Sequence, residues 1–185
     1  MKGTIKLDLL KEKVDNLELQ IEEITIRHDV SKFKCSNTSI NTYLKSDAYY
    51  ENIMKFANTK IVTFNGKIAA YYTLQFDNIE IREDEFEATY PTIHLKYLAV
   101  DETFEQMGIG TTLIEHITIE CEKISKVIGC RCLLIHALKD KVEWYRDRGF
   151  QYIDEEHNMD IYDTTVPMFI DFRDSQLIID YFEEV

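Results

Sequence analysis

An apolar segment, a glycine-containing loop, a long amphipathic stretch and a second apolar run follow one another between Ile93 and Ala137. Residues 93–100 are typical of a strand, and residues 108–128 suit a helix with one apolar stripe. Residues 130–137 are almost continuously apolar, as in a strand that is buried on both faces. A strand–helix–strand segment of this kind is a βαβ unit, so we expect at least one parallel pair of strands.

The segment before this unit predicts a strand, a helix and a hairpin. Apolar alternation indicates a strand over residues 17–27, and Ser36 and Asn37 offer N-caps for a helix over 39–56. Asn65-Gly66 is a strong hairpin signal between two strands, which we place at residues 60–64 and 67–76. Residues 7–15 fit either a short helix or a frayed tail. The acidic residues 77–90 fit a solvated insertion.

The segment after the unit completes the expected fold. Residues 139–148 suit a short helix, and residues 150–154 and 167–172 suit a closing pair of strands. The chain is therefore expected to be α/β or α+β, with a mixed sheet and helices on both of its faces. A length of 185 residues favours one domain over residues 1–185. Within it we expect a core over about 17–172, an N-terminal extension over 1–16 and a C-terminal helix over about 174–183.

Charge and cysteine content restrict the classes of function. The net charge of −13 opposes a broad nucleic-acid-binding surface, because such surfaces neutralise phosphates with Lys and Arg. The four cysteines lack the spacing of a zinc site, so we expect buried thiols and no metal. No segment has the pattern of a signal peptide or of a membrane span, which favours a cytoplasmic protein with no membrane partner.

The loop before the long helix is the clearest candidate for a binding site. Gly108 and Gly110 lie between the end of a strand and the start of the helix. The first N–H groups of a helix have no partner within it, and the helix dipole places partial positive charge there. Glycine lets the backbone approach phosphate oxygens, so a pyrophosphate could bind here without any basic side chain.

Three segments of the chain, Leu98–Leu113, Trp144–Phe150 and Phe33–Leu44, resemble the GNAT superfamily of acetyltransferases. The stretch from Leu98 to Leu113 resembles its acetyl-CoA-binding signature, Gln/Arg-x-x-Gly-x-Gly/Ala. Trp144-Tyr145 followed by Gly149-Phe150 resembles its second marker, an aromatic-Tyr pair shortly before Gly-Phe. Upstream, Phe33-Lys34-Cys35 and a helix containing Tyr43-Leu44 resemble the branch that includes tRNA-acetylating toxins. The resemblance covers residues 17–172 and implies a mostly antiparallel sheet.

The resemblance also implies roles for particular residues, with acetyl-CoA as the acetyl donor. Leu98 and Val100, with Ala99 between them, would pair through the backbone with the pantetheine arm. Tyr145 would lie near the thioester sulfur and protonate the leaving thiolate. The pyrophosphate would be bound at Gly108 and Gly110 and by the backbone amides of Gln106, Met107, Ile109 and Thr111.

One residue departs from the signature. Glu105 stands at the first position, where the superfamily usually has Gln or Arg, and a carboxylate beside a pyrophosphate is unfavourable unless it points to solvent. If the register shifts by one residue, Gln106 could take that place.

Acetyl transfer to an amine needs a neutral nucleophile, a stabilised oxyanion and a protonated leaving group. A phenol with an ordinary pKa near 10 suits Tyr145 as the acid. The base is open, with His94, Glu80, Glu83 and His136 as candidates. Alternatively, the amine proton could leave through water.

The sequence leaves three functions open. The first is acetylation of a primary amine on a small molecule, a peptide or a protein. The second is toxin-like acetylation of the amino acid on a charged tRNA, which Lys32, Lys34, Lys45, Lys55 and Lys60 could support as a local basic patch. The third is a CoA-binding module without catalysis. The segment over residues 169–182 is a candidate for packing across a homodimer.

Overall fold

Two strands meet at a tight turn around Asn65 and Gly66, as the sequence predicts. Strand β3 (Asn58–Phe64) and strand β4 (Lys67–Glu83) are antiparallel, and Phe64 is the register partner of Lys67. Asn65 and Gly66 both have positive φ, 50° and 75°. Positive φ at both central residues is the conformation of a type I′ hairpin turn, and Asn-Gly supplies it with little strain.

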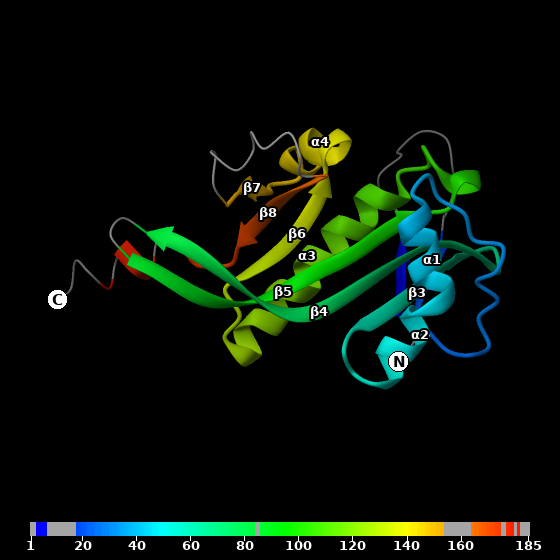
Figure 1. Ribbon diagram of the computed structural model, residues 1–185, viewed down its shortest axis with the longest axis horizontal. Helices are drawn as coiled ribbons and strands as arrows, with labels where there is room; N and C mark the ends of the chain where they lie inside the picture. The colour runs from blue at the N-terminus through cyan, green and yellow to red at the C-terminus, as the bar shows by residue number, and fades with distance from the viewer. Residues whose placement is uncertain are drawn as a thin grey trace. The chain divides into compact units, whose positions relative to one another are not determined.

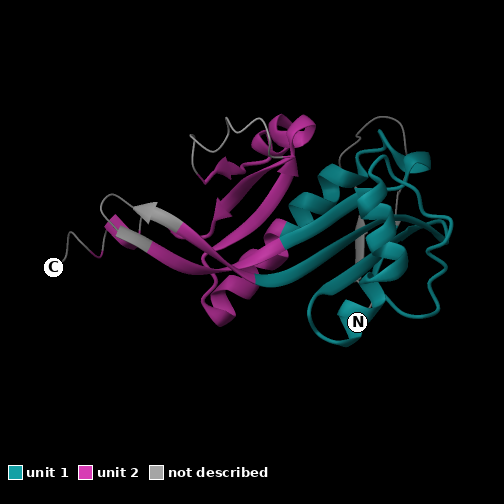
Figure 2. Ribbon diagram, in the orientation of Figure 1, with its two compact units in different colours: residues 1–76, 95–117 teal, residues 77–94, 118–185 magenta. Residues whose placement is uncertain are grey.

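The computed structural model describes residues 3–6, 18–83, 86–153, 164–174, 177–179 and 181 (Figure 1). The chain divides into two compact units, which are coloured separately in Figure 2. The first unit holds residues 1–76 and 95–117, and the second holds residues 77–94 and 118–185. Strand β4, strand β5 (Phe86–Val100) and helix α3 (Ile109–Ile128) each contribute residues to both units.

The first unit combines strands and helices in a mixed α/β arrangement. Its strands follow the order β1 (Gly3–Lys6), β2 (Glu18–Glu23), β3, β4 and β5. The pairs β1–β2, β2–β3 and β3–β4 are antiparallel. Ala69, Ala70, Tyr71 and Tyr72 are all buried, and burial of consecutive strand residues means that both faces of β4 are covered. The pairing of β1 is a feature that the sequence did not predict.

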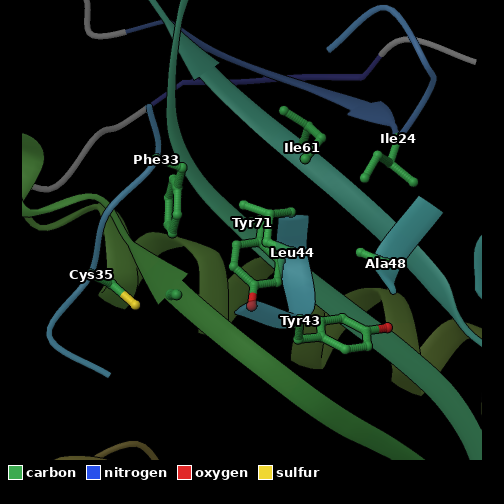
Figure 3. Close-up of a cluster of buried hydrophobic side chains, with 9 residues drawn as sticks. Ile24, Phe33, Cys35, Tyr43, Leu44, Ala48, Ile61 and Tyr71 are labelled. Carbon is green, nitrogen blue, oxygen red and sulfur yellow. The ribbon is translucent and has the colours of Figure 1, made fainter. Parts of the chain in front are cut away.

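An apolar cluster packs helices α1 (Thr38–Ser46) and α2 (Ala48–Ile53) onto one face of this sheet. Tyr43, Leu44 and Ala48 come from the helices, and Ile61 and Tyr71 come from the strands (Figure 3). The Tyr71 hydroxyl donates a hydrogen bond to the carbonyl oxygen of Ile40 at 2.7 Å, so the buried phenol is satisfied. Phe33 packs edge-on against Tyr71, with ring centroids 5.4 Å apart. Phe33 and Cys35 both belong to this core cluster, whereas Lys34 between them is exposed.

The expected helix over 39–56 is shorter and is divided in two. Asn37 caps α1, because its side-chain oxygen accepts a hydrogen bond from the Ile40 amide at 3.2 Å. Helix α2 ends at Ile53, and Lys55 has a left-handed φ of 61°. The Phe56 amide then donates to the Glu51 carbonyl at 3.0 Å, which closes the helix end. The prediction of helix as far as Phe56 was wrong for this reason.

The strands of the second unit follow the order β4, β5, β6 (Cys132–Leu138), β8 (Thr165–Asp171) and β7 (Gln151–Tyr152). Strand β6 follows α3 in the chain and is the sheet neighbour of β5, so the expected strand–helix–strand unit is present. The pairs β6–β8 and β7–β8 are antiparallel, and β7–β8 is the expected closing pair. Ile79, Cys132 and Leu134 form a buried cluster in this unit.

The expectation of a solvated insertion over residues 77–90 was wrong. Residues 77–83 belong to the end of β4, and residues 86–90 belong to the start of β5. Ile79 is only 6% exposed, whereas its neighbours Asn78 and Glu80 are exposed. Among the acidic residues whose side chains are described, Glu80 therefore lies on the outer face of β4, opposite to the buried Ile79, and the acidic composition of the segment concealed this alternation.

The C-terminal residues 177–179 and 181 are helical, which agrees with the expected helix in the part that is described. Residues 7–15, for which the sequence left helix and tail open, lie outside the described residues. None of the described helices is long and apolar enough to cross a membrane.

Candidate functional site: a glycine loop and a tyrosine marker

A buried aspartate anchors the chain that leaves strand β5. Asp101 Oδ2 accepts a hydrogen bond from the Lys34 amide at 2.9 Å, and Oδ1 accepts from the Thr103 amide and hydroxyl at 3.0 and 2.6 Å. Burial of Asp101 opposes its ionisation, but these donors outweigh burial and hold the pKa of the carboxyl below its usual value. Asp101 is also the N-cap of the short helix η1 (Glu102–Phe104), so the loop starts from a fixed position.

The loop reaches helix α3 through two residues in the left-handed region. Gln106 has a φ of 64° and Gly108 a φ of 78°, on either side of Met107. Residues of this conformation close to a helix start turn backbone N–H groups towards one side, which is typical of anion-binding concavities. A Cβ added to Gly108 would meet no heavy atom within 4 Å, so the space in front of this residue is open to a ligand.

Helix α3 begins directly after Gly108. The Thr112 amide donates to the Gly108 carbonyl at 3.1 Å, and Ile109 is buried beneath the first turn with 1% exposure. Gly110 and Thr111 are half-buried in this turn. Thr112 Oγ1 is buried and has no hydrogen-bond partner among the described residues. The N-terminal end of a 20-residue helix, with its partial positive charge, thus directly follows the open position at Gly108.

The carboxylate that departs from the signature does not lie in the interior. Glu105 is exposed, as is Gln106 beside it. An exposed carboxylate is hydrated and screened, so it opposes a bound pyrophosphate much less than a buried one would. The side chain of Glu105 thus reaches solvent, as a pyrophosphate bound nearby would require.

The strand residues expected along the pantetheine arm lie at the end of β5 in the same unit as the loop. Ala99 is 7% exposed and belongs to the apolar cluster of the first unit. Leu98 and Val100 are half-buried, and strand alternation places them on the face opposite to Ala99. Their side chains therefore do not belong to the cluster that holds Ala99.

Tyr145 lies on the short helix α4 (Val142–Arg146) in the second unit. Its ring packs edge-on against Trp144 and Phe150, with centroids 4.8 and 5.4 Å away. Gly149 has a φ of 87°, which turns the chain so that Phe150 returns to Tyr145. Arg148 covers the Trp144 ring, with its guanidinium carbon 3.9 Å from the ring centroid. The aromatic-Tyr and Gly-Phe markers are thus two halves of one small cluster.

Packing leaves the Tyr145 hydroxyl without a hydrogen-bond partner among the described residues. Burial raises the pKa of Tyr145 to about 12, and the nearby Arg148 acts in the opposite direction. The phenol therefore keeps its proton at neutral pH and can donate a hydrogen bond. Complete transfer of that proton to a thiolate of pKa near 8.5 would be uphill by about 5 kcal/mol. A role for Tyr145 as a proton donor would therefore require a second proton to replace the first as it leaves.

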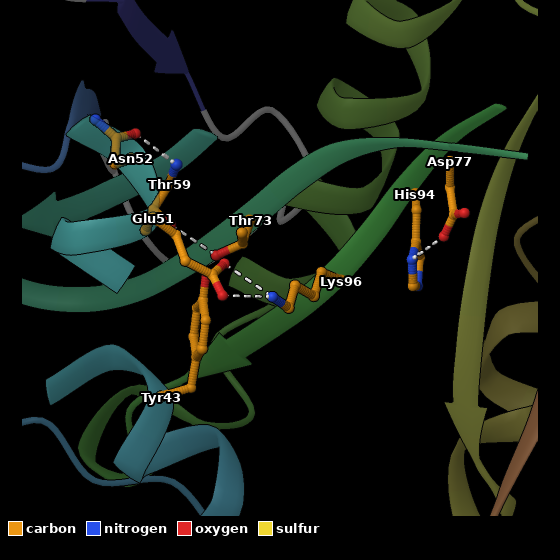
Figure 4. Close-up of polar contacts among 8 residues, drawn as sticks. All are labelled: Tyr43, Glu51, Asn52, Thr59, Thr73, Asp77, His94 and Lys96. Atoms are coloured by element: carbon orange, nitrogen blue, oxygen red, sulfur yellow. Dashed lines mark hydrogen bonds and ion pairs between the residues drawn. The ribbon is translucent and has the colours of Figure 1, made fainter. Parts of the chain in front are cut away.

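The candidates for the base have different surroundings. His94 lies on β5 with its side chain 12% exposed, and its Nδ1 is 3.2 Å from Asp77 Oδ2 (Figure 4). His136 lies on β6, and its ring centroid is 5.1 Å from that of His94. Glu80 is exposed on β4. The side chain of Glu83 lies outside the described residues.

A polar network in the first unit was not foreseen from the sequence. Lys96 Nζ is 2.9 and 2.8 Å from the two carboxylate oxygens of Glu51, and the Tyr43 hydroxyl donates to Glu51 at 2.8 Å (Figure 4). Burial, together with the Glu51 carboxylate, raises the pKa of Tyr43. The ammonium of Lys96 also lies 4.9 Å from the centroid of the Tyr43 ring. The network joins α2 to β5, and no local motif signals a contact over 45 residues.

Only some lysines of the expected basic patch lack an ion pair to a described residue. Lys34 forms an ion pair with Glu102 at 2.9 Å, and Lys55 forms one with Glu23 at 3.8 Å. Lys32 and Lys45 are exposed, with no ion pair to a described residue. All four cysteines are free and buried, as expected. No cluster of metal-binding side chains occurs among the described residues.

Comparison with known proteins identifies the family. The model of the acetyltransferase (GNAT) domain matches residues 57–152, more than half of the chain. A tRNA-acetylating toxin of Mycobacterium tuberculosis (strain ATCC 25618 / H37Rv) is 25% identical over 120 residues, which cover 61% of this chain and 72% of the toxin.

Solved structures of toxins share the fold. A mutant of the toxin AtaT bound to the C-terminus of the antitoxin AtaR has a TM-score of 0.70 at 23% identity and covers 86% of this chain and 97% of its own. AtaT complexed with acetyl-methionyl-tRNAfMet has a TM-score of 0.70 at 21% identity, and the match covers 87% of this chain and 99% of the AtaT chain. The glycine loop, the tyrosine marker and the family match lead to one conclusion. The chain belongs to the GNAT family of acetyltransferases.

Proposed function

We propose that this protein transfers the acetyl group of acetyl-CoA to the α-amine of an aminoacyl-tRNA. The main observation in support of this acceptor is the similarity to a tRNA-acetylating toxin over 120 residues. The fold shared with AtaT in its complex with acetyl-methionyl-tRNAfMet supports the same acceptor. This is the second of the three functions that the sequence left open.

The donor site that we propose is the glycine loop with the end of strand β5. The loop is open in front of Gly108 and receives the partial positive charge of α3, so it fits the pyrophosphate without a basic side chain. Leu98 and Val100 would offer backbone groups to the pantetheine arm, with Ala99 holding the strand to the core. The amides proposed for the pyrophosphate are those of Gln106, Met107, Gly108, Ile109, Gly110 and Thr111. AtaTR, which has the same fold, has been solved bound with acetyl-CoA.

The chemistry of the acceptor also favours an α-amine. An α-amino group has a pKa near 7.7, whereas a lysine side chain has a pKa near 10.4. At pH 7 the neutral, nucleophilic fraction is therefore about 400-fold larger for the α-amine. The ester of an aminoacyl-tRNA withdraws electrons and lowers the pKa of its amine further. Such an acceptor needs little help to lose its first proton.

The acidic surface sets a limit on the contact with tRNA. Of the five lysines of the proposed patch, Lys32, Lys45 and Lys60 have no ion pair to a described residue; Lys32 and Lys45 are exposed, and Lys60 is half-buried. Two phosphate contacts correspond to a slope of about −2 in a plot of log affinity against log salt concentration. We therefore propose that recognition centres on the acceptor end of the tRNA and not on a long stretch of its backbone.

A second candidate acceptor is a small or peptide amine of high positive charge. The net charge of −13 favours it, because an acidic protein attracts cations over long range. A third reading, a CoA-binding module without catalysis, conflicts with the retained tyrosine marker. Replacement of Tyr145 by Phe separates this reading from the first two, since only an enzyme would lose turnover.

The acceptor can be tested by measuring thiol release from acetyl-CoA. The panel contains charged tRNAs, the same tRNAs uncharged, free amino acids, polyamines and basic peptides. We expect release with charged tRNA and none with uncharged tRNA. Release with a polyamine or a peptide in place of charged tRNA would contradict the proposal and support the second candidate.

The proposed function implies a setting for the protein. Charged tRNA and reduced thiols are found together in the cytoplasm, and the four free cysteines agree with that compartment. AtaT is described bound to its antitoxin AtaR, and we propose that this chain also has a protein partner that restrains it. Packing of the exposed Leu177 and Tyr181 across a homodimer stays a prediction.

A further inference from the structure

Four apolar side chains on helix α2 and the turn after it are exposed in the first unit. Tyr50 is 55% exposed, Ile53 53%, Met54 48% and Phe56 62%. Residues 50, 53 and 54 have the i, i+3 and i+4 spacing of one helix face. The rings of Tyr50 and Phe56 pack edge to face, with centroids 6.5 Å apart. Together these four residues form the α2 surface, whose two rings contact each other and still reach solvent.

The segment that carries the α2 surface is basic, although the whole chain is acidic. From the end of β2 to the end of β3, residues 24–64 contain six Lys and Arg against three Asp and Glu, whereas the chain contains 21 against 34. Lys45 is exposed and has no ion pair to a described residue. Lys55 is 77% exposed, and its ion pair with Glu23 is 3.8 Å long. An exposed pair of this kind contributes little, so Lys55 can exchange it for a phosphate.

The α2 surface is tied to the strand on which we place the acetyl donor. Glu51 follows Tyr50 on α2, and its carboxylate oxygens lie 2.9 and 2.8 Å from Lys96 Nζ (Figure 4). Lys96 precedes Leu98 by two residues in β5, which is about 7 Å along a strand. A pantetheine arm that runs from the glycine loop back along Val100 and Leu98 would end towards Lys96. All of these residues belong to the first unit.

We propose that the α2 surface binds the unpaired 3′ nucleotides of the tRNA. Bases stack on the rings of Tyr50 and Phe56, and Lys45 and Lys55 bind the phosphates between them. This role rests on the proposed acetylation of aminoacyl-tRNA, because the amino acid is esterified to the 3′ end. A short single strand needs few cations, so an acidic protein can hold it without a long basic face.

The arrangement of rings and cations favours a nucleotide strand over a protein partner. Lysine is depleted in protein–protein interfaces relative to the rest of the surface. Here Lys55 directly precedes Phe56, and Lys45 lies five residues before Tyr50. Sites for single-stranded nucleic acid combine cations that follow the backbone with aromatic rings on which successive bases stack. The α2 surface has both components in one segment of the chain.

The test measures whether the α2 surface and the 3′ nucleotides of the tRNA are energetically coupled. Affinities are measured by fluorescence anisotropy for two uncharged tRNAs, one at full length and one that lacks its unpaired 3′ nucleotides. Phe56→Ala is compared with a matched control, Phe76→Ala. Phe76 is also in the first unit and is 67% exposed, but it lies on β4. Phe56→Trp keeps a ring at the site, and Phe56→Leu keeps only apolar bulk.

We expect Phe56→Ala to weaken binding of full-length tRNA by about fivefold or more. Its affinity for the truncated tRNA should equal that of wild type, because the stacked base is missing there. Phe56→Trp should bind as wild type does, Phe56→Leu should bind as Phe56→Ala does, and Phe76→Ala should change neither affinity. Replacement of Lys45 and Lys55 together by Gln should reduce the slope of log affinity against log salt concentration by about 1.4, since two phosphate contacts to a single strand are lost.

Equal losses for both tRNAs in Phe56→Ala, or no loss, would overturn the proposal. So would wild-type affinity in Phe56→Leu, because apolar bulk without a ring would then suffice. Unchanged affinities together with loss of self-association, measured by sedimentation, would assign the surface to a protein contact instead. Binding is measured without turnover, so the two proposals fail separately. Coupled binding without acetylation of charged tRNA would refute the proposed function alone, and acetylation without coupling would refute the α2 surface alone.

Discussion

Alanine is expected to have opposite effects on stability at Gly108 and Gly110, which lie only two residues apart. Gly108 has a φ of 78°, and an added Cβ would meet nothing within 4 Å, so the penalty is backbone strain alone. Left-handed backbone costs a residue with a Cβ about 1–2 kcal/mol. Gly110 lies in the first turn of α3, where alanine is favoured over glycine by about 0.5–1 kcal/mol.

These free energies convert into melting temperatures. For a chain of this length, 1 kcal/mol corresponds to about 2–4 °C. Gly108→Ala should therefore melt about 2–8 °C below wild type, and Gly110→Ala about 1–4 °C above it. Both variants should bind acetyl-CoA more weakly, because each adds a methyl group where we expect the pyrophosphate to approach the backbone.

The hairpin provides a matched control for strain without a ligand. Gly66 has a φ of 75°, and an added Cβ there also meets nothing within 4 Å. Gly66→Ala should lower the melting temperature as Gly108→Ala does and leave acetyl-CoA affinity unchanged. Scanning calorimetry and isothermal titration with acetyl-CoA measure the two effects. Wild-type affinity in both loop variants would refute the assignment of the site, and wild-type stability of Gly108→Ala would refute the strain argument.

Three further perturbations test other parts of the account. Tyr145→Phe removes a hydroxyl that has no hydrogen-bond partner among the described residues, so thermal stability should hardly change. In a thiol-release assay kcat should fall about 100-fold or more, because the proposed proton donor is lost. A kcat equal to that of wild type would reject the role of Tyr145 as proton donor. Because the pKa of Tyr145 is raised to about 12, the wild-type rate should also show no loss from its ionisation between pH 7 and 10. Asp101→Asn replaces an acceptor with an amide that cannot satisfy the same donors and should lower the free energy of unfolding by about 1–3 kcal/mol at pH 7. The pKa of Asp101 is lower in the folded state, so its contribution to the free energy of unfolding is present above the unfolded pKa and is lost as the pH falls through the folded pKa. Urea titrations should therefore show that the stability difference between wild type and Asp101→Asn shrinks in acid. A stability difference that does not depend on pH would contradict this. Burial raises the pKa of all four cysteines, and in Cys121 and Cys132 it raises the pKa to about 12. An alkylating reagent at pH 8 should therefore modify none of them in the native protein and all of them in denaturant. Rapid labelling of the native protein, detected by mass spectrometry, would contradict their burial.

Features that depend on one or two residues were predictable from the sequence. The hairpin at Asn65-Gly66 follows from the preference of these residues for positive φ. Gly129, with a φ of 65°, ends α3 where a left-handed residue was expected. The glycine loop was also found, because a strand, a loop and an amphipathic helix follow one another without a break in the chain.

Features that depend on long-range pairing were not predictable in the same way. The acidic composition of residues 77–90 predicted an insertion, because it conceals the buried position of Ile79 in β4. Strand β1 is recognised only through its pairing with β2. The pair of His94 with Asp77 depends on how β4 and β5 align over 17 residues, and a single sequence does not specify that alignment.

The central claim is that the acetyl group is transferred to the α-nitrogen of an amino acid esterified to tRNA. The most direct measurement incubates the enzyme with acetyl-CoA and charged tRNA, hydrolyses the ester bond and identifies the released amino acid by mass spectrometry. We predict an N-acetyl amino acid that forms in the wild-type reaction and is nearly absent with Tyr145→Phe. Recovery of the amino acid unmodified, from a wild-type enzyme that acetylates another amine under the same conditions, would contradict the claim.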